Sequence, residues 1–246
     1  MFRKLIAGYK RHEVKLLLEQ KEKSLFVRDD RMKWFCRHWY EVGLFPAGLA
    51  FVFLLIGWGD MPALQRISFV NFIGIMLHQF EEYGFPGGAP TFGNKYMRGG
   101  TDRYPLNQFS AMLVNVLIAY ACYLLPIFFP DVIWLGLAPI LFGCIFQVVL
   151  HLVVFAIKFR HFYNSGLAAV LCIHVPCGIA YIYFANEQRL LNGKVWLFAI
   201  AYLLAMIVFT VLFGQKLLAN ENSIYPFDEK EVEAGERFAR KMGISK

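Results

Sequence analysis

The chain has 246 residues, of which 58% are apolar and 17% aromatic, and its formal net charge is +7 at pH 7. Soluble globular domains contain about 45–50% apolar residues, so this composition excludes an ordinary soluble domain and indicates a membrane protein. A basic chain can bind nucleic acid, but here the Lys and Arg residues flank apolar segments and form no basic stripe. We therefore expect no nucleic-acid partner.

The first 40 residues are too charged to cross a membrane, and they contain a run of good helix formers, EVKLLLEQKEK. They predict a cytoplasmic or interfacial amino-terminal helix over residues 1–40. A transmembrane domain is expected over residues 41–219. A polar cytoplasmic tail follows over residues 220–246, with a short helix after Pro226.

Six apolar segments approach the length of about 20 residues that a bilayer-spanning helix needs. Breakers rich in Gly, Pro and charged residues separate them. The predicted spans are Val42–Trp58, Arg66–Tyr83, Gln108–Phe129, Val132–Ile157, Tyr163–Phe184 and Val195–Leu218. The predicted fold class is therefore all-α, a polytopic six-transmembrane helix bundle.

The distribution of Lys and Arg predicts the orientation of the bundle. With both termini in the cytoplasm, the inner segments hold 22 of the 25 basic residues and the outer segments hold 3. This asymmetry agrees with the positive-inside rule. We therefore expect an integral protein of an inner or plasma membrane, embedded in the lipid bilayer with cytoplasmic amino and carboxy termini.

The second span ends in the polar stretch HQFEE. His78, Glu81 and Glu82 are i, i+3 and i+4 neighbours, so a helix brings them to one face. Asn71 lies two turns earlier on the same stripe. Ionisable groups at membrane depth are costly and usually functional. The alternative is that this span ends early and leaves its carboxylates in water.

The later spans carry polar side chains in the same, inner half of the bilayer. These side chains are Asn115, Gln147, His151, Tyr163, Asn164 and His174, with Tyr163 and Asn164 placed at the start of the fifth span. Simple interhelical hydrogen bonding is the alternative role for Asn71, Asn115 and His174, with Gln147 as the partner of His174.

Imidazole and carboxylate groups together suit a divalent metal ion, with Zn or Fe favoured. The expected ligands are His78, Glu81, Glu82, His151 and His174. Glu81 and Glu82 are also the candidates for catalytic groups, for example as a general base. The expected supporting residues around the ligands are Asn71, Asn115, Gln147, Tyr163 and Asn164.

The stretch from His78 to Glu82 resembles the signature of the HXXEE family of integral membrane proteins. That resemblance implies a metal-binding membrane enzyme, although it names no reaction. The family also has an Asn-xxx-His element and a YNPG-like segment, which Gln147-Val-Val-Leu-His151 and Tyr163-Asn164-Ser165-Gly166 match. The sequence departs from this family pattern at two positions, with Gln147 in place of Asn and Ser165 in place of Pro. The longer side chain of Gln147 puts the role of this residue in question, but not that of His151.

Three functional hypotheses remain open at this point. The first is a metal-dependent enzyme, a hydrolase or an oxidoreductase, that acts on a lipid or another hydrophobic substrate. The second is a proton- or ion-coupled transporter that uses the same Glu and His residues. The third is a non-catalytic membrane scaffold. For the enzyme, the glycine-rich loop after Glu82 is expected to be a flexible lid.

Overall fold

A computed structural model describes residues 30–244 and divides the chain into two units, Met1–His38 and Trp39–Lys246. The described part of the first unit is helical from Asp30 onward. Most of the amino-terminal helix predicted over residues 1–40 lies outside the described residues, so this helix stays a prediction.

The second unit is built from helices, and no strand occurs among its described residues, which confirms the all-α class. Several helices change along their length from α-helical to π-helical hydrogen bonding, a feature often found at functional sites. The α-helical segments are α2 (Leu44–Gly57), α3 (Ala63–Tyr83), α4 (Ala89–Phe92), α5 (Gln108–Leu117), α6 (Leu125–Phe128), α7 (Ile133–Leu141), α8 (Phe155–Phe159), α9 (Leu167–Ala169), α10 (Val175–Glu187), α11 (Gly193–Leu212) and α12 (Glu229–Lys241). The π-helical segments are η1 (Gly93–Met97), η2 (Ile118–Tyr123), η3 (Phe142–Phe146), η4 (Val149–Val154), η5 (Val170–His174) and η6 (Phe213–Leu217).

Five helices among the described residues are long and apolar enough to cross a membrane, which supports a helical membrane protein. They are Asp30–Gly57, Gln108–Phe128, Ile133–Phe159, Leu167–Glu187 and Gly193–Leu217. The predicted span Arg66–Tyr83 forms the 21-residue helix α3 but is not one of the five. Its charged and amide side chains lower its hydropathy, so the count of six spans stays a prediction.

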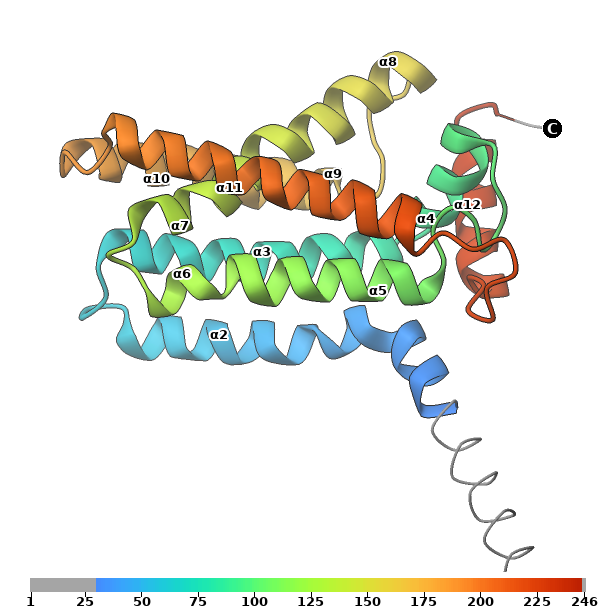
Figure 1. Cartoon of the computed structure of the whole chain (residues 1–246), viewed down its shortest axis with the longest axis horizontal. Helices are drawn as coiled ribbons and strands as arrows, with labels where there is room; N and C mark the ends of the chain where they lie inside the picture. Colours follow the sequence, from blue (N-terminus) through green and yellow to red (C-terminus); the bar gives the residue numbers. More distant parts are fainter. Residues whose placement is uncertain (1–29, 245–246) are drawn as a thin grey trace, which may run out of the picture. The chain divides into compact units, whose positions relative to one another are not determined.

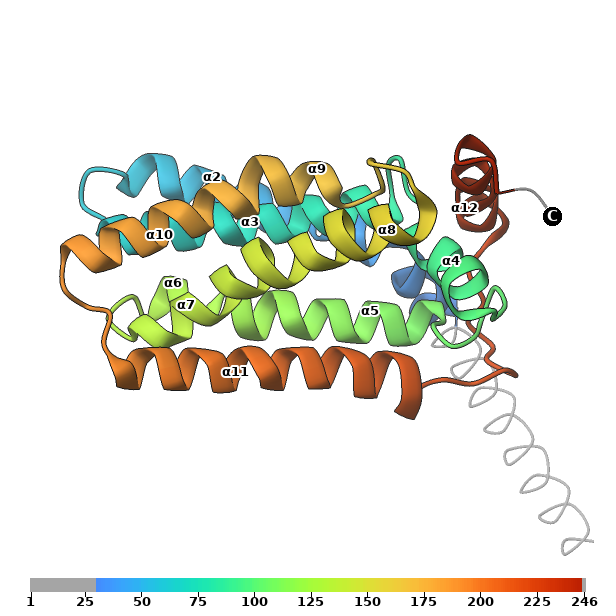
Figure 2. The same ribbon diagram turned by 90° about the horizontal axis from the view of Figure 1, so that it is seen from above.

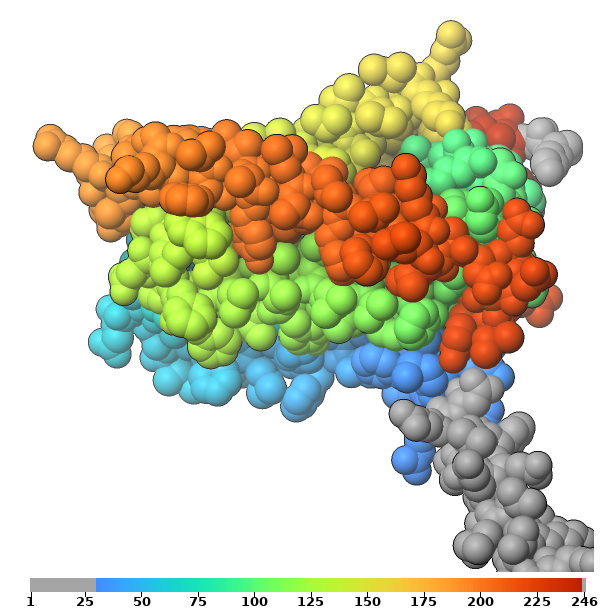
Figure 3. Space-filling view, viewed as in Figure 1, coloured from blue at the N-terminus to red at the C-terminus, as the bar shows by residue number. Residues whose placement is uncertain are grey.

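Helix α3 runs through the middle of the bundle, with α2, α5 and α10 around it (Figure 1, Figure 2). Its Phe72 and Ile75 side chains belong to an apolar cluster shared with α2 and η2. Leu64 belongs to a second cluster shared with α7 and α10. Because protein surrounds it, α3 can carry polar side chains at a lower cost than a lipid-facing helix. Helix α11, by contrast, forms a continuous band on the outer surface (Figure 3).

The segment after α3 differs from the flexible loop that we expected. It folds into α4 and η1, and α4 packs against α12, the helix predicted after Pro226. Close packing here requires glycine, because a Cβ on Gly88 would lie 2.5 Å from the backbone nitrogen of Gly235. The Thr91 hydroxyl donates a hydrogen bond to the Glu231 carbonyl at 2.9 Å. Helical structure and these contacts replace the expected loop.

Candidate metal centre

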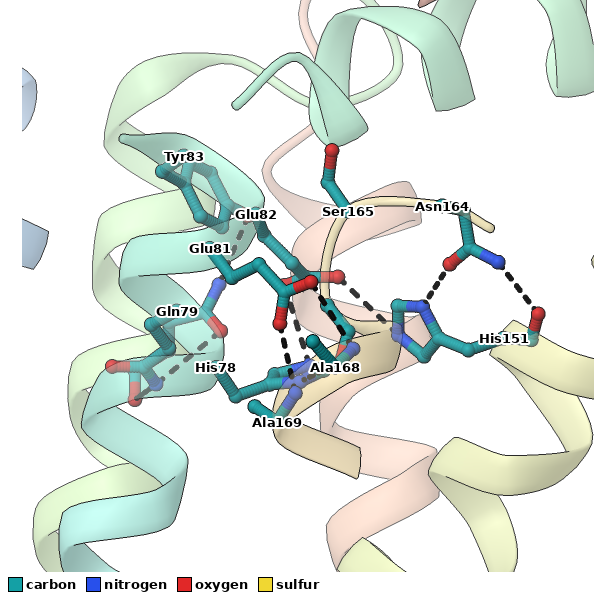
Figure 4. Close-up of polar contacts among 12 residues, drawn as sticks. His78, Gln79, Glu81, Glu82, Tyr83, His151, Asn164, Ser165, Ala168 and Ala169 are labelled. Carbon is teal, nitrogen blue, oxygen red and sulfur yellow. Dashed lines mark hydrogen bonds and ion pairs between the residues drawn. The ribbon is translucent and has the colours of Figure 1, made fainter. Parts of the chain in front are cut away.

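The last turns of α3 bring the HQFEE residues to the site. His78 is 1% exposed and Glu81 is 8% exposed, whereas the Glu82 side chain is 20% exposed. As the i, i+4 spacing predicts, the His78 Nε2 atom lies 3.7 Å from a Glu82 carboxylate oxygen. Glu81 points in another direction, toward α9 (Figure 4). The two adjacent carboxylates therefore have different surroundings.

His151 reaches the same carboxylate from η4. Its Nε2 atom lies 3.5 Å from the other oxygen of Glu82. The rings of His78 and His151 are 5.0 Å apart between centroids and nearly perpendicular, at 86°. The three possible ligand atoms of His78, Glu82 and His151 all lie within 4.8 Å of one another. The structure thus brings together residues that are far apart in the sequence.

Hydrogen bonds set the tautomer of each imidazole. His78 Nδ1 donates to the Gly166 carbonyl at 3.0 Å, because a carbonyl oxygen can only accept. His151 Nδ1 donates to the Asn164 side-chain oxygen, whose identity follows from the Asn164 amide nitrogen donating to the His151 carbonyl. Both Nε2 atoms therefore carry a free lone pair. Ligating histidines in metal sites are oriented in this way.

The segment from Tyr163 to Gly166 supports the site residue by residue, as Figure 4 shows for its labelled members. Tyr163 donates from its hydroxyl to Glu81 at 3.0 Å, and Ser165 donates to the Gly87 carbonyl at 2.7 Å. Tyr163 and Asn164 were expected to open the fifth span, but the helix begins at Leu167. They lie in the irregular segment before it, where their side chains can reach back to α3 and η4.

Gly166 is the functional residue that the sequence reasoning left without a role. It has a φ of 101°, which strongly favours glycine. A Cβ at this position would lie 2.6 Å from Cε1 of His151 and 2.8 Å from Cε1 of His78. Gly166 therefore makes room for both imidazole rings, and its carbonyl orients one of them. The sequence signal was its place at the end of the YNPG-like segment.

Glu81 stabilises the start of a helix. One carboxylate oxygen accepts from the Ala168 backbone N–H at 3.1 Å, and the other accepts from the Ala169 N–H at 2.9 Å. With the Tyr163 hydroxyl, three donors surround this carboxylate. These N–H groups belong to the first turn of a helix and have no partner within it. Glu81 thus connects α3 to α9 instead of facing the two imidazoles.

His174 lies deeper in the bundle and is fully buried. Its ring centroid is 5.8 Å from that of His78. His174 Nδ1 hydrogen-bonds to the Asn71 side-chain oxygen at 2.8 Å, so its partner is Asn71 and not Gln147. Its Nε2 atom, like that of His78, has no hydrogen-bond partner among the described residues. The close group formed by His78, Glu82 and His151 does not include His174.

Asn115 serves the α3–α5 contact. Its side-chain amide donates to the Tyr83 hydroxyl at 3.1 Å, and its backbone carbonyl accepts from the Gln79 side chain at 3.1 Å. Gln147 lines a cavity beside His151, and the structure records no hydrogen bond between these two side chains in the described part of the chain. Asn115 acts on Tyr83, the neighbour of Glu82, so its contact with the site is indirect.

Two cavities meet at Glu82 and His151. One, of about 180 Å³, is lined in part by α4 and α12 and includes Asn164 and Phe238 in its wall. The other, of about 220 Å³, extends between α5, η3 and α11. A carboxylate and two imidazoles with free Nε2 lone pairs can bind a divalent metal ion. The cavities give such a centre space on two sides.

Comparison with known proteins supplies one match. Neither a curated protein nor a solved structure matches this sequence. Residues 69–181 match the family described as a protein of unknown function with HXXEE motif. The matched region includes most of α3, both histidines near Glu82 and the Tyr163–Gly166 segment. The resemblance to the HXXEE family that the sequence indicated is thereby confirmed over these residues.

Proposed function

We propose that His78, Glu82 and His151 bind a divalent metal ion and that this protein is a metal-dependent membrane enzyme. One observation carries the proposal: two imidazoles present free Nε2 lone pairs to the two oxygens of one carboxylate. The distances of 3.5 and 3.7 Å are longer than ordinary hydrogen bonds. The buried His78 Nε2 atom also has no hydrogen-bond partner among the described residues.

The residue types fit Zn or Fe(II). Two His and one carboxylate form a ligand set of catalytic zinc sites and of non-haem iron oxygenases, and both kinds of site keep a coordination position open. When bound, such an ion would supply either an activated water or redox chemistry. The structure favours neither reaction, so hydrolase and oxidoreductase remain two forms of one proposal.

The surrounding residues have distinct roles in this proposal. Glu82 is the carboxylate ligand and borders both cavities, where a substrate would meet it. Glu81 is a positioning residue, because its three hydrogen bonds fix the end of α3 against α9. Asn164 and Gly166 keep the two imidazoles in their tautomers. His174 is a candidate further ligand from deeper in the bundle.

The substrate is proposed to be a lipid or another hydrophobic molecule. The centre lies at the α4 and α12 end of a bundle whose outer surface is apolar. The positive-inside asymmetry of the sequence favours the cytoplasmic half of the membrane for this end. A substrate dissolved in the bilayer could reach the cavities from the side.

Elemental analysis of the purified full-length protein tests the centre. We expect a stoichiometric divalent metal in the wild type and its loss in His78→Ala, Glu82→Gln and His151→Ala. His161→Ala is the matched control, because this partly exposed ring bonds to the Tyr163 carbonyl and lies outside the centre. Circular dichroism checks that every variant is folded.

Two results would contradict the proposal. Equal metal content in the wild type and in all folded variants would remove these three residues as ligands. A metal-free wild type that carries out ion flux in proteoliposomes, with the flux lost in Glu82→Gln, would establish the transporter instead.

A further inference from the structure

The inner cavity beside Glu82 and His151 has an apolar interior. Its wall includes Ile75, Val114, Phe142 and other aliphatic and aromatic side chains from α3, α5, η3 and α11. Its two charged side chains, Glu82 and Arg98, lie at the ends of α3 and η1 and define its polar end; the amides of Asn115 and Gln147 and the Thr210 hydroxyl also line it. A cavity with a largely apolar wall and a charged end suits an amphiphile.

The helix that ends in η4 and α8 leans away from α11, as Figure 1 shows. Leu150 of η4 and Val211 of α11 both line the cavity, and each is 38% exposed. Apolar side chains on the outer face of this helix, such as Val149 and Val153, are exposed as well. An apolar chain in the bilayer could therefore enter between η4 and α11.

Arg98 provides a positive charge at the polar end. It follows η1, lines both cavities, and donates from Nε to the Gln215 side chain at 3.1 Å. No ion pair of Arg98 occurs among the described residues, whereas Lys95 pairs with Glu236 and Arg103 pairs with Asp102. An arginine without an acidic partner at a cavity mouth is suited to an anionic group of a ligand.

We propose that the two cavities bind a single-chain amphiphile with an anionic head group. Its alkyl chain occupies the inner cavity, and its carboxylate or phosphate binds Arg98 beside Glu82. The volume of about 220 Å³ is below the roughly 300–1,000 Å³ of drug-sized ligand sites, so the inner cavity holds part of one alkyl chain and excludes a second. The remainder of a long chain lies in the opening between η4 and α11. The inference names the substrate class of the proposed enzyme, and thus rests on that function for its biological meaning.

Direct binding of radiolabelled palmitate to the full-length protein in non-ionic detergent tests this assignment. We expect saturable binding, with hexadecanol, the neutral analogue, bound at least about tenfold more weakly. Arg98→Gln should lose this preference, and Arg98→Lys should keep part of it. Arg103→Gln is the matched control and should bind like the wild type. Competition by a single-chain lysophosphatidate in place of palmitate would identify phosphate as the preferred head group.

A second pair of variants tests the position of the alkyl chain. Val211→Trp fills the inner cavity and should weaken palmitate and hexadecanol alike. Val208→Trp adds the same bulk to α11 at a residue that is 58% exposed and does not line this cavity, so it should have no effect.

Three results would overturn the inference: equal affinity for palmitate and hexadecanol, no effect of Arg98→Gln, or competition by a two-chain phosphatidate as strong as that of palmitate. Metal content measured on the same samples separates the two proposals. Absent metal with Arg98-dependent palmitate binding would refute the metal centre alone. Metal retained by a protein that binds no palmitate would refute this inference alone.

Discussion

Helices α3 and α11 are of nearly equal length, with 21 and 20 residues, but they have opposite surroundings. In α3, 12 residues are buried, among them Asn71, His78, Gln79 and Glu81. In α11, Ala199 and Met206 are the only buried residues, so most of its apolar side chains face outward. The helix with the weaker membrane-span signature is therefore the one at the centre. Of these two helices, the one surrounded by protein carries the buried polar side chains, and the one at the surface carries mainly exposed apolar side chains.

If the functional side chains gather around α3, substitution of a glycine near the site should be much more damaging than substitution of a glycine on α11. This pair should show the largest difference. Gly166→Ala places a Cβ against both imidazoles at a positive φ. We expect loss of metal binding and a cost of about 1–3 kcal/mol in stability from backbone strain, with the steric clash added. In Gly193→Ala, at the start of α11, the new Cβ meets nothing within 4 Å. Thermal unfolding and metal content should be measured for both variants. Equal stability and equal metal content in the two would contradict the proposed difference between the site and α11.

Asparagine side chains provide the next comparison. Asn164→Ala removes the acceptor that orients His151, and we expect metal affinity to fall by about 10–100-fold. Asn192→Ala removes the side chain that caps α11, where it accepts from the Lys194 and Val195 N–H groups. That variant should lose about 1 kcal/mol of stability and no metal affinity. Metal titration distinguishes them, and an unchanged affinity in Asn164→Ala would contradict the assigned role.

Removal of a buried hydrogen bond should cost more inside α3 than on α11. Asn71→Val leaves the His174 Nδ1–H group buried without its acceptor, at a cost of about 1–3 kcal/mol. Thr210→Val removes a hydroxyl whose one hydrogen bond within the described part of the chain goes to the Met206 carbonyl of its own helix, so the change should stay within about 0.5 kcal/mol. Unfolding in detergent would test the pair. Similar losses would show that the position in the bundle does not decide the cost.

The smallest effect is expected outside both helices, where Glu236 of α12 accepts from Lys95 and Tyr96. The Lys95 hydrogen bond lowers the pKa of Glu236 below 4.5, and the same bond raises the pKa of Lys95 above 10.5. The contribution of the Lys95–Glu236 pair to the free energy of unfolding is therefore fully present between pH 4.5 and pH 10.5. It is lost as pH falls through the lowered carboxyl pKa or rises through the raised amine pKa.

Because the Lys95–Glu236 pair is partly exposed, its contribution should be no more than about 1 kcal/mol and should weaken with salt. Glu236→Gln should therefore remove most of the pH dependence of α12 docking below pH 5 while leaving metal content unchanged. Measuring the rate of proteolysis at α12 as a function of pH tests this. A loss of metal in Glu236→Gln would contradict the prediction, because it would show that metal binding depends on this contact of α12.

The positions of the helices could be predicted from the sequence because apolar length and breakers are local signals. The last predicted span, Val195–Leu218, nearly coincides with the helix Gly193–Leu217. The start of the fifth helix was placed too early, at Tyr163 instead of Leu167, because the predicted span was extended into the polar segment Tyr163–Gly166. Its irregular backbone depends on the positive φ of Gly166, which hydropathy does not report.

The candidate site could be predicted only in part. Helical spacing alone predicts the proximity of His78 and Glu82, since these two residues are one turn apart. The approach of His151 depends on how two helices pack, and its depth in the bilayer and the family resemblance only suggested it. Spacing also placed Glu81 on the same face, but its hydrogen bonds at the α9 N-terminus decide where it points. Depth in the bilayer likewise suggested Gln147 as the partner of His174, whereas packing brings Asn71 to it.

The hydrogen bonds of Glu81 bear on how the chain is assembled during synthesis. The first backbone N–H groups of a helix usually find an acceptor in a neighbouring residue of the same chain segment. Here the acceptor precedes Ala168 by 87 positions, so it emerges from the ribosome well before the helix that it caps. The later helix can complete its first turn only by docking on the earlier one, which makes its correct insertion depend on a partner already in place.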